Sequence, residues 1–439
     1  MTNALKILIL STFPPEHSAG LGANVMSALS RGGHHVTYIS RYKGASTYSH
    51  KSVEESVPNK NGKIKKLLPN RIKKLLFEYI SKIKESVKGY NRLVYKDELD
   101  PAINPNRIIQ TIDDGTKYDL IITLFWVNFI NSTSLVKLGN FFKCPVLIYA
   151  VDMAPMTGGC YYFYNCNNYQ SECGECPLLE KNSKSDQSHI NFLIKKANYK
   201  KIPCAFLGNS WMNKFARESN LFSNIFPTNV VISEDEFHPA DQRIIRDKFG
   251  LSDDKIIFMA RSWDIKRKGM EYIISGIYNL SKSLSPENKK RLLVITIGDE
   301  KIKEELEKKG ISVRHFGFVE KPRLIQLYQA STYFLSASTD DAGPSMINQA
   351  IMCGTPVVCF NNGTAIDVIH NKISGFKSDE ISTGNYYKSL EDAFYYALTD
   401  RYEDLRRTTR ETAMRECSST HFCSRINSIY NEMNKKNTK

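Results

Sequence analysis

The segment 331–376 holds the residues of this chain that are best suited to chemistry. Its pattern predicts a buried strand, an acidic loop with Asp341 and Gly343, a short helix opened by Pro344, and a second strand. Ligands of such parallel units bind at the carboxyl ends of the strands. Pro344 suits the first helical position, and the helix N-terminus then favours an anion above Gly343. The segment therefore predicts a diphosphate site.

This segment resembles the donor-binding signature of GT-B glycosyltransferases, especially the retaining family 4 enzymes. That signature has an acidic residue, seven others, a second acidic residue and then A-x-x-C-G-T-P-V-V, and here Asp341 is followed by seven residues and by Gln349. The resemblance implies that Asp341 lies near the transferred sugar as a catalytic residue and that position 349 contacts the ribose. Gln349 is neutral, so its contact would be weaker than that of a carboxylate. The resemblance also assigns Gly343, Pro344 and Ser345 to donor binding.

A second motif supplies positive charge. Residues 258–269 read FMARSWDIKRKG and resemble the family's strand followed by an arginine and a Lys-Gly pair, whose cations neutralise the donor diphosphate. We assign these roles to Arg261 and Lys268, with Arg267 as a substitute because the spacing is two residues longer than in common members. Fixed cations would stabilise a leaving nucleoside diphosphate, so no catalytic metal is required. The alternative is a solvated Lys-Arg-Lys turn.

Three weaker motifs extend the resemblance. Gly317-Phe318 resembles the segment whose backbone receives the nucleotide base. Gly20 and Gly22 follow the first expected strand, where family members carry a glycine-rich loop beside the reacting sugar, although a tight turn explains them equally well. Residues 151–160, VDMAPMTGGC, resemble an element of enzymes of surface polysaccharide and lipopolysaccharide assembly, with Val151 in place of a histidine. Asp152 is therefore a catalytic candidate for orienting the acceptor or the sugar.

Four of the ten cysteines lie within seventeen residues, at Cys160, Cys166, Cys173 and Cys176. Closely spaced thiols in a chain without a secretion signal favour a metal, and Cys-x-x-Cys is a normal half of a tetrahedral zinc site. Such a zinc would be structural, because four thiolates leave no open position for a substrate. The alternatives are a redox-labile cluster or two local disulfides.

Composition and charge set the frame around these motifs. The chain has 439 residues, is 41% hydrophobic and carries a net charge of +14. We expect a cytoplasmic protein, because no signal peptide and no apolar stretch of about 20 residues is present. The stretch from Lys60 to Lys88 holds ten basic and only two acidic residues, and its apolar spacing predicts a helix. That helix would lie at an anionic inner-membrane surface or pack its apolar face in the core. No nucleic-acid-binding signature accompanies it.

The fold class predicted by the alternation of strands and helices is doubly wound α/β. The resemblance implies the GT-B architecture, with two Rossmann-like domains facing across a cleft and a C-terminal helix that crosses back. We expect an acceptor-binding domain at 1–235, a nucleotide-sugar-binding domain at 236–405 and a helical tail at 406–439 that packs on the first domain. The expected strands are 6–10, 35–39, 119–125, 145–150 and 229–232, then 255–260, 291–298, 312–318, 332–336 and 355–360.

Together these patterns predict a retaining glycosyltransferase. It would move a sugar from a nucleotide-diphosphate donor to a lipid-linked glycan in surface polysaccharide biosynthesis, as a peripheral protein at the inner face of the cytoplasmic membrane. Two alternatives stay open. A GT-B-type sugar-nucleotide epimerase would need no acceptor, and a non-catalytic partner of an assembly complex would agree with the neutral Gln349.

Overall fold

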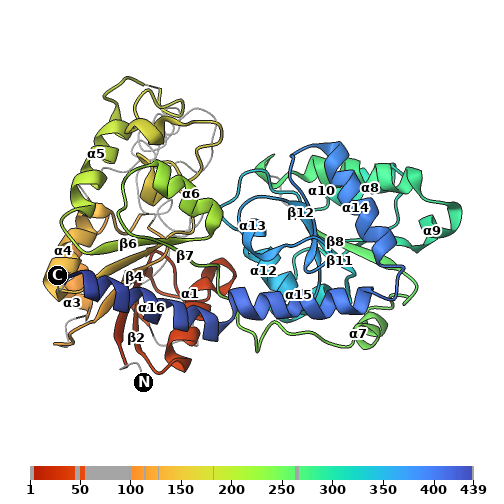
Figure 1. Ribbon diagram of the computed structural model, residues 1–439, viewed down its shortest axis with the longest axis horizontal. Helices are drawn as coiled ribbons and strands as arrows, with labels where there is room; N and C mark the ends of the chain where they lie inside the picture. Colours follow the sequence, from red (N-terminus) through yellow and green to blue (C-terminus); the bar gives the residue numbers. More distant parts are fainter. Residues whose placement is uncertain are drawn as a thin grey trace, which may run out of the picture. The chain divides into compact units, whose positions relative to one another are not determined.

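The computed structural model describes residues 4–44, 50–54, 98, 101–112, 115–126, 128–180, 182–262 and 266–437. The chain divides into two compact units (Figure 1). The first comprises Met1–Gly208, Met212–Pro227 and Ile426–Lys439, and the second comprises Asn209–Trp211 and Thr228–Arg425. The helix expected within Lys60–Lys88 lies outside the described residues.

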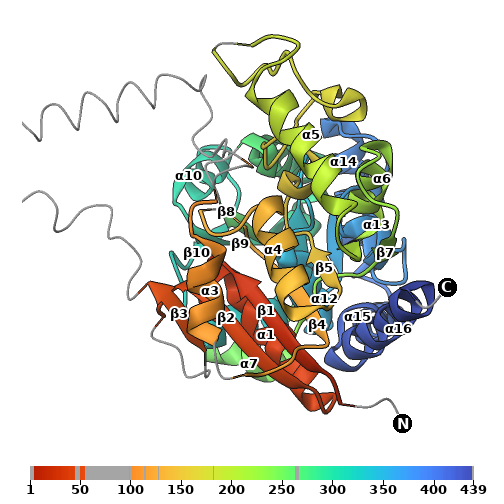
Figure 2. The same ribbon diagram turned by 90° about the vertical axis from the view of Figure 1, so that its left-hand side faces the viewer.

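The described residues of the first unit form a parallel sheet of seven strands in the order β3-β2-β1-β4-β5-β6-β7. Figure 2 shows β3, β2 and β1 side by side at one edge. The central strands β4, β5 and β6 are buried at every residue, as expected for parallel strands that are covered on both faces. The strands are β1 Lys6–Ser11, β2 His35–Tyr42, β3 Lys51–Glu54, β4 Leu120–Thr123, β5 Val146–Tyr149, β6 Cys204–Gly208 and β7 Ile225–Pro227. The α-helices are α1 His17–Arg31, α3 Pro105–Ile112, α4 Ser132–Phe142, α5 Gln187–Tyr199 and α6 Ser210–Glu218, with short 3-10 helices at Ala154–Met156 and Asn168–Ser171.

The second unit has a parallel sheet of six strands within its described part, in the order β10-β9-β8-β11-β12-β13. Two apolar cores pack on the two faces of this sheet, one containing Ile257 and Met259 and the other Phe258 and Ala260. Alternate residues of β8 thus enter opposite cores, as the two-residue period of a strand requires. The strands are β8 Ile256–Ser262, β9 Leu292–Gly298, β10 Val313–His315, β11 Tyr333–Ser336, β12 Val357–Phe360 and β13 Gly375–Ser378. The helices are α7 Gln242–Lys248, α8 Met270–Ser283, α9 Pro286–Arg291, α10 Lys301–Lys308, α11 Lys321–Ala330, α12 Ser345–Met352, α13 Ala365–Val368, α14 Thr383–Tyr396, α15 Tyr402–Cys417 and α16 Ser419–Asn437, with a 3-10 turn at Lys266–Lys268.

One expected strand is wrong. The apolar run 229–232 is not a strand, and the preceding β7 is the edge strand instead. The run is apolar because it is buried among helices. Asn348 of α12 donates to the carbonyl of Val230 at 3.0 Å, and Ile232 donates its N–H to the carbonyl of Cys417 at 2.9 Å.

The observed division also differs from the expected boundaries at 235 and 405. The second unit begins at Thr228, and α15 belongs to it because Leu405 and Ala413 are buried in its two cores. The part of the tail that belongs to the first unit starts at Ile426, within α16.

No helix among the described residues is long and apolar enough to cross a membrane.

Candidate functional site

The candidate site lies where the strand order of the second sheet reverses. The chain runs from β8 outward through β9 to β10, then returns to the other side of β8 as β11. In open parallel sheets, ligands bind outside the carboxyl ends of the two strands that flank such a switch point. Arg261 lies near the end of β8, Arg267 and Lys268 follow that strand, and Asp341 lies in the loop that follows β11. The topology therefore brings the two main sequence motifs to one place.

Close backbone packing holds these two loops together. The N–H of Thr339 donates to the carbonyl of Arg267 at 2.8 Å. Gly269, at φ +62°, begins α8, and a Cβ atom at this position would lie 2.0 Å from the carbonyl oxygen of Ala337. Only glycine fits both this φ and this approach. The Lys-Gly pair of the sequence is thus a packing requirement as well as a source of charge.

Three charged side chains meet between the loops. Asp341 accepts a hydrogen bond at 2.8 Å from Arg267 and another from the ammonium of Lys268 through the same oxygen, Oδ2. Its other oxygen accepts from the N–H of Gly343 at 3.3 Å. The side chains of Arg267 and Lys268 are each 13% exposed and that of Asp341 is 6% exposed. These are buried ion pairs, and a buried charge without its partner is strongly destabilising.

The electrostatics of this cluster favour an added anion. Burial lowers the pKa of Lys268, Asp341 opposes that effect, and repulsion from Arg267 and Arg261 adds to it. Burial would raise the pKa of Asp341, but Lys268 and Arg267 outweigh burial and hold that pKa below its usual value. Three cations thus act around one carboxylate. A bound diphosphate would neutralise the excess positive charge.

The helix α12 begins beside this cluster, as predicted, but its first residue is Ser345. Pro344 precedes the helix with an extended ψ of 107°, so its predicted place at the first helical position is wrong by one residue. No side chain caps the helix. The N-terminal amides and the positive end of the dipole therefore lie next to Gly343, where an anion is favoured.

Gln349 lies within α12 and is only 2% exposed. Its side-chain oxygen accepts a hydrogen bond of 3.3 Å from the hydroxyl of Tyr328 in α11. Burial raises the pKa of Tyr328 to about 12, and nearby Arg261 works against that effect. Tyr328 thus connects Gln349 to the cationic end of β8, a link that the sequence motifs did not indicate.

Gly317 and Phe318 follow β10. Gly317 has φ +59°, and its carbonyl accepts from the N–H of Gly298 at the end of β9 at 2.7 Å. The side chain of Phe318 is 83% exposed. An aromatic face and a turn of backbone are therefore presented at the carboxyl ends of the outer strands β9 and β10.

Two residues that pack against the backbone of the Asp341 loop were not indicated by the sequence motifs. Asn209 donates to the carbonyl of Ala342 at 2.6 Å. Gly363, at φ +53°, would place a Cβ atom 2.5 Å from the carbonyl oxygen of Asp341. Neither residue belongs to a motif, because each matters only through its distance from a loop that is remote in the sequence.

The two glycines predicted near the first strand are not in a loop, because α1 begins at His17 and contains both. Gly20 has φ +77°, which requires glycine, and the space around its Cβ position is open. At Gly22 a Cβ atom would lie 2.5 Å from the hydroxyl oxygen of Tyr38. Packing against β2 thus accounts for Gly22, whereas the positive φ accounts for Gly20, which is buried.

Asp152 lies three residues after β5 and is partly buried. Its carboxylate accepts from the N–H of Ala154 at 2.9 Å. Burial raises the pKa of Asp152 to about 6, against the opposing effects of the Ala154 N–H and Lys195. The ammonium of Lys195 donates to the carbonyls of Ala154 and Thr157 at 2.7 and 2.8 Å and forms an ion pair with Glu98 at 3.4 Å. A buried lysine therefore fixes the turn that carries Asp152.

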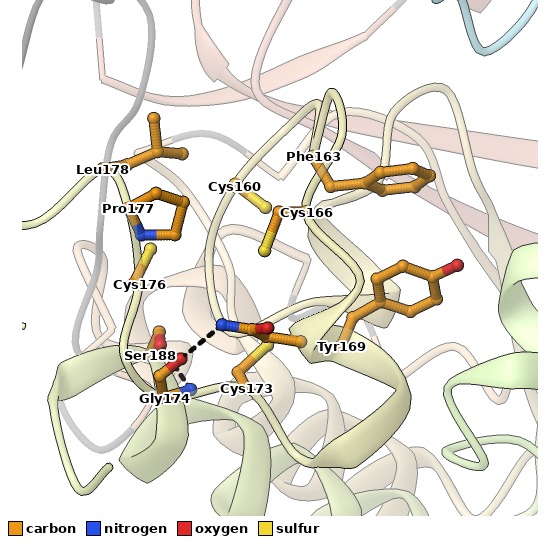
Figure 3. Close-up of a pocket in the computed structure, with 11 residues that line it drawn as sticks. Cys160, Phe163, Cys166, Tyr169, Cys173, Gly174, Cys176, Pro177, Leu178 and Ser188 are labelled. Carbon is orange, nitrogen blue, oxygen red and sulfur yellow. Dashed lines mark hydrogen bonds between the residues drawn. The ribbon is translucent and has the colours of Figure 1, made fainter. Parts of the chain in front are cut away.

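The four predicted metal ligands Cys160, Cys166, Cys173 and Cys176 all line one pocket of the first unit (Figure 3). They are free thiols. As placed, no three His, Cys, Asp or Glu side chains in the described ranges already form a set that could hold a metal ion.

The candidate site of the second sheet lies in a part of the chain that matches a family of enzymes. Residues 241–415, which include Arg261, Arg267, Lys268, Asp341 and Gln349, match the family model described as Glycosyl transferases group 1. The two Rossmann-like α/β units are those of the GT-B fold. No curated protein sequence matches the chain.

Solved structures, two of them of glycosyltransferases, resemble the chain over nearly its whole length. A glycosyltransferase from Rickettsia africae is 16% identical with a TM-score of 0.63, covering 99% of both chains. HepE of Anabaena, solved with UDP-glucose, is 14% identical with a TM-score of 0.58 and covers 99% of both chains. WaaG, a glycosyltransferase involved in lipopolysaccharide biosynthesis, is 14% identical with a TM-score of 0.58, covering 98% of this chain and 99% of WaaG. Such identities show the fold alone, and the family match adds support for glycosyl transfer.

Proposed function

We propose that this protein is a glycosyltransferase whose second unit binds a nucleoside diphosphate sugar. The observation that carries the proposal is the cluster of Arg267, Lys268 and Asp341 at the switch point of the second sheet, beside the N-terminus of α12. A site that combines excess positive charge, helix amides and a carboxylate suits a diphosphate joined to a sugar.

In this proposal the cations act on the leaving group. Negative charge grows on the nucleoside diphosphate as the glycosidic bond breaks, and fixed cations in a water-poor site stabilise that charge. Arg261, Arg267 and Lys268 take this role, so the step needs no divalent cation. Asp341 contacts the sugar hydroxyls and also holds Arg267 and Lys268 in place.

The rest of the donor would extend along α12 and toward β10. Gly343, Pro344 and Ser345 lie beside the phosphates, and Gln349 contacts the ribose through an amide that Tyr328 orients. Gly317 and Phe318 receive the base. HepE, which has the same fold, was solved with UDP-glucose.

The first unit would bind the acceptor, with Gly20 and Asp152 at the carboxyl ends of β1 and β5. We propose retention of the anomeric configuration, as in family 4 enzymes, and a lipid-linked glycan acceptor in surface polysaccharide biosynthesis at the inner membrane face. The resemblance of residues 151–160 to polysaccharide-assembly enzymes and the fold shared with WaaG support this choice.

Calorimetric titration tests the donor site without knowledge of the acceptor. We expect nucleoside diphosphates to bind at least about tenfold more tightly than the matching nucleosides, because each charge-assisted contact contributes about 1.5–3 kcal/mol. Equal affinity for a nucleoside and its diphosphate, across uridine, guanosine, adenosine and thymidine forms, would contradict the proposal. A nucleotide-sugar epimerase would pass this test but would convert the donor without an acceptor.

Asp152 gives a prediction on pH. If its carboxylate orients the acceptor, the initial rate of transfer should fall as the pH drops through about 6, where this group becomes protonated. Asp152→Asn keeps an oxygen for the Ala154 N–H but removes the charge, so the variant should be slow at every pH.

The free energy of unfolding should depend on pH in the opposite direction to the rate of transfer. The raised pKa of Asp152 means that the folded protein binds its proton more tightly than the unfolded chain, so this contribution to stability is lost as the pH rises from about 4 to about 6. Relative to wild type, Asp152→Asn should therefore be more stable at pH 7 than at pH 5, by about 1 kcal/mol, because about one pKa unit of the shift lies between pH 5 and the folded pKa. Urea unfolding at both pH values measures this difference, and no pH-dependent difference would show that Asp152 titrates normally.

A further inference from the structure

Four thiols surround one cavity in the loop between β5 and α5. Cys160, Cys166, Cys173 and Cys176 line one small pocket. Figure 3 shows their side chains around this common space. The four residues come from a stretch of only seventeen residues, yet no two of them form a disulfide.

Backbone amides already point at two of the sulfur atoms. The N–H of Gly158 donates to Sγ of Cys173 at 3.2 Å. A backbone hydrogen bond from Asn168 reaches Cys166. Polar partners around the ligating atoms orient metal ligands.

The loop that carries Cys173 has an unusual backbone that its surroundings fix. Glu172, Cys173, Gly174 and Glu175 all have positive φ, at 70°, 59°, 96° and 46°. Non-glycine residues rarely adopt this conformation, and a run of them persists only when other contacts over-determine it.

The first turn of α5 supplies those contacts. The N–H of Gly174 donates to the hydroxyl of Ser188 at 3.0 Å, and Asn168 donates to the carbonyl of Gly174 at 2.8 Å, as drawn in Figure 3. Asp186, which caps α5, also accepts from the N–H of Cys176 at 2.8 Å. The half of the cluster that contains Cys173 and Cys176 is therefore held by the start of α5, and Asn168 links it to the part of the loop next to Cys166.

We propose that these four cysteines hold one structural zinc ion. Four sulfur donors from one loop suit a tetrahedral site for zinc, and they exclude calcium and magnesium, which prefer oxygen ligands. As placed, the described side chains do not form a metal-holding set, so zinc binding would require the four thiols to turn toward one point in the pocket that they line. Binding replaces four S–H protons by four Zn–S bonds and changes no oxidation state.

The site would fix the segment that follows Asp152. A zinc ion would join Cys160 to Cys176. Cys160 lies close to the turn that Lys195 holds, and Cys176 is hydrogen-bonded to the start of α5. This role does not depend on which sugar the protein transfers, and it would stand if the proposed function failed.

Metal analysis of the whole chain, purified without chelators under reducing conditions, tests the proposal. We expect about one zinc per chain, and cobalt loaded in its place should give the intense visible absorption of tetrahedral cobalt thiolate. Cys173→Ser should lose most of the metal, and its thermal midpoint should fall by about 10 °C if zinc is present at about a thousand times its dissociation constant.

Cys144→Ser is the matched control, because Cys144 is also buried but does not line the pocket. This variant should keep its zinc. A second readout covers the case in which Cys173→Ser fails to fold. Wild-type protein denatured in chelator without reductant should show all ten cysteines as free thiols. A count of six free thiols would show two disulfides. An absence of zinc from freshly reduced wild-type protein would overturn the proposal.

Discussion

Lys268→Ala should lower kcat/KM for the nucleotide sugar by about 10²-fold or more, the usual cost of removing one group that stabilises developing negative charge. The Lys268 side chain is 13% exposed, and although it pairs with Asp341 it is also repelled by Arg267 and Arg261, so an added diphosphate would relieve that repulsion. Steady-state kinetics with the natural or best available donor measures the effect. Nucleoside diphosphate binding should weaken in parallel.

Lys266→Ala is the control for this prediction. Lys266 lies two residues away in the same 3-10 turn, but its side chain is exposed. Both variants remove one positive charge from the same segment, so a general effect of net charge would affect them equally. A Lys268→Ala enzyme as active as Lys266→Ala would remove Lys268 from the site.

Asp341→Asn should reduce transfer by about 10²-fold or more while leaving nucleoside diphosphate affinity unchanged or increased. The asparagine oxygen can still accept from the N–H of Gly343, but it no longer neutralises Arg267 and Lys268. Those two cations are then more available to phosphate, whereas the sugar loses its carboxylate partner. Comparison of turnover with calorimetric affinity separates the two effects.

The neighbouring Asp340→Asn provides the comparison for Asp341→Asn. Both changes remove one negative charge from the same loop, and Asp341→Asn breaks the ion pairs of that residue with Arg267 and Lys268. A loss of thermal stability is also expected for Asp341→Asn, because buried cations without a partner destabilise a fold by about 3–5 kcal/mol. Full activity in a folded Asp341→Asn protein would show that Asp341 is not a catalytic residue.

Much of the donor half could be predicted from local sequence. The strand, loop, helix and strand around Asp341 were predictable because each element carries its own signal: a buried β-branched run, a proline, and a Gly-Thr-Pro turn. The parallel pairing of β11 with β12 followed from the connection between them. The shape of the Arg261–Lys268 loop was less certain, since its spacing departs from the family pattern.

The contacts that make the site could not be predicted. Asp341 meets Arg267 and Lys268 across more than 70 residues of chain, and Tyr328 meets Gln349 across 21. Such pairs depend on the register of the strands and on close approaches such as that of Gly269 to Ala337. The run 229–232 failed as a strand for a related reason: burial against helices produces the same apolar sequence as burial in a sheet.

The central claim is that the chain transfers a sugar and releases a nucleoside diphosphate. The most direct measurement incubates purified protein with a panel of nucleotide sugars, with and without extracted lipid-linked glycans, and follows free nucleoside diphosphate by mass spectrometry. We expect one donor to release its diphosphate in the presence of acceptor, at a rate that Asp341→Asn and Lys268→Ala each lower by about 10²-fold or more and that Lys266→Ala leaves unchanged. No release above the protein-free rate with any donor and acceptor, or release that survives both site variants, would contradict the account.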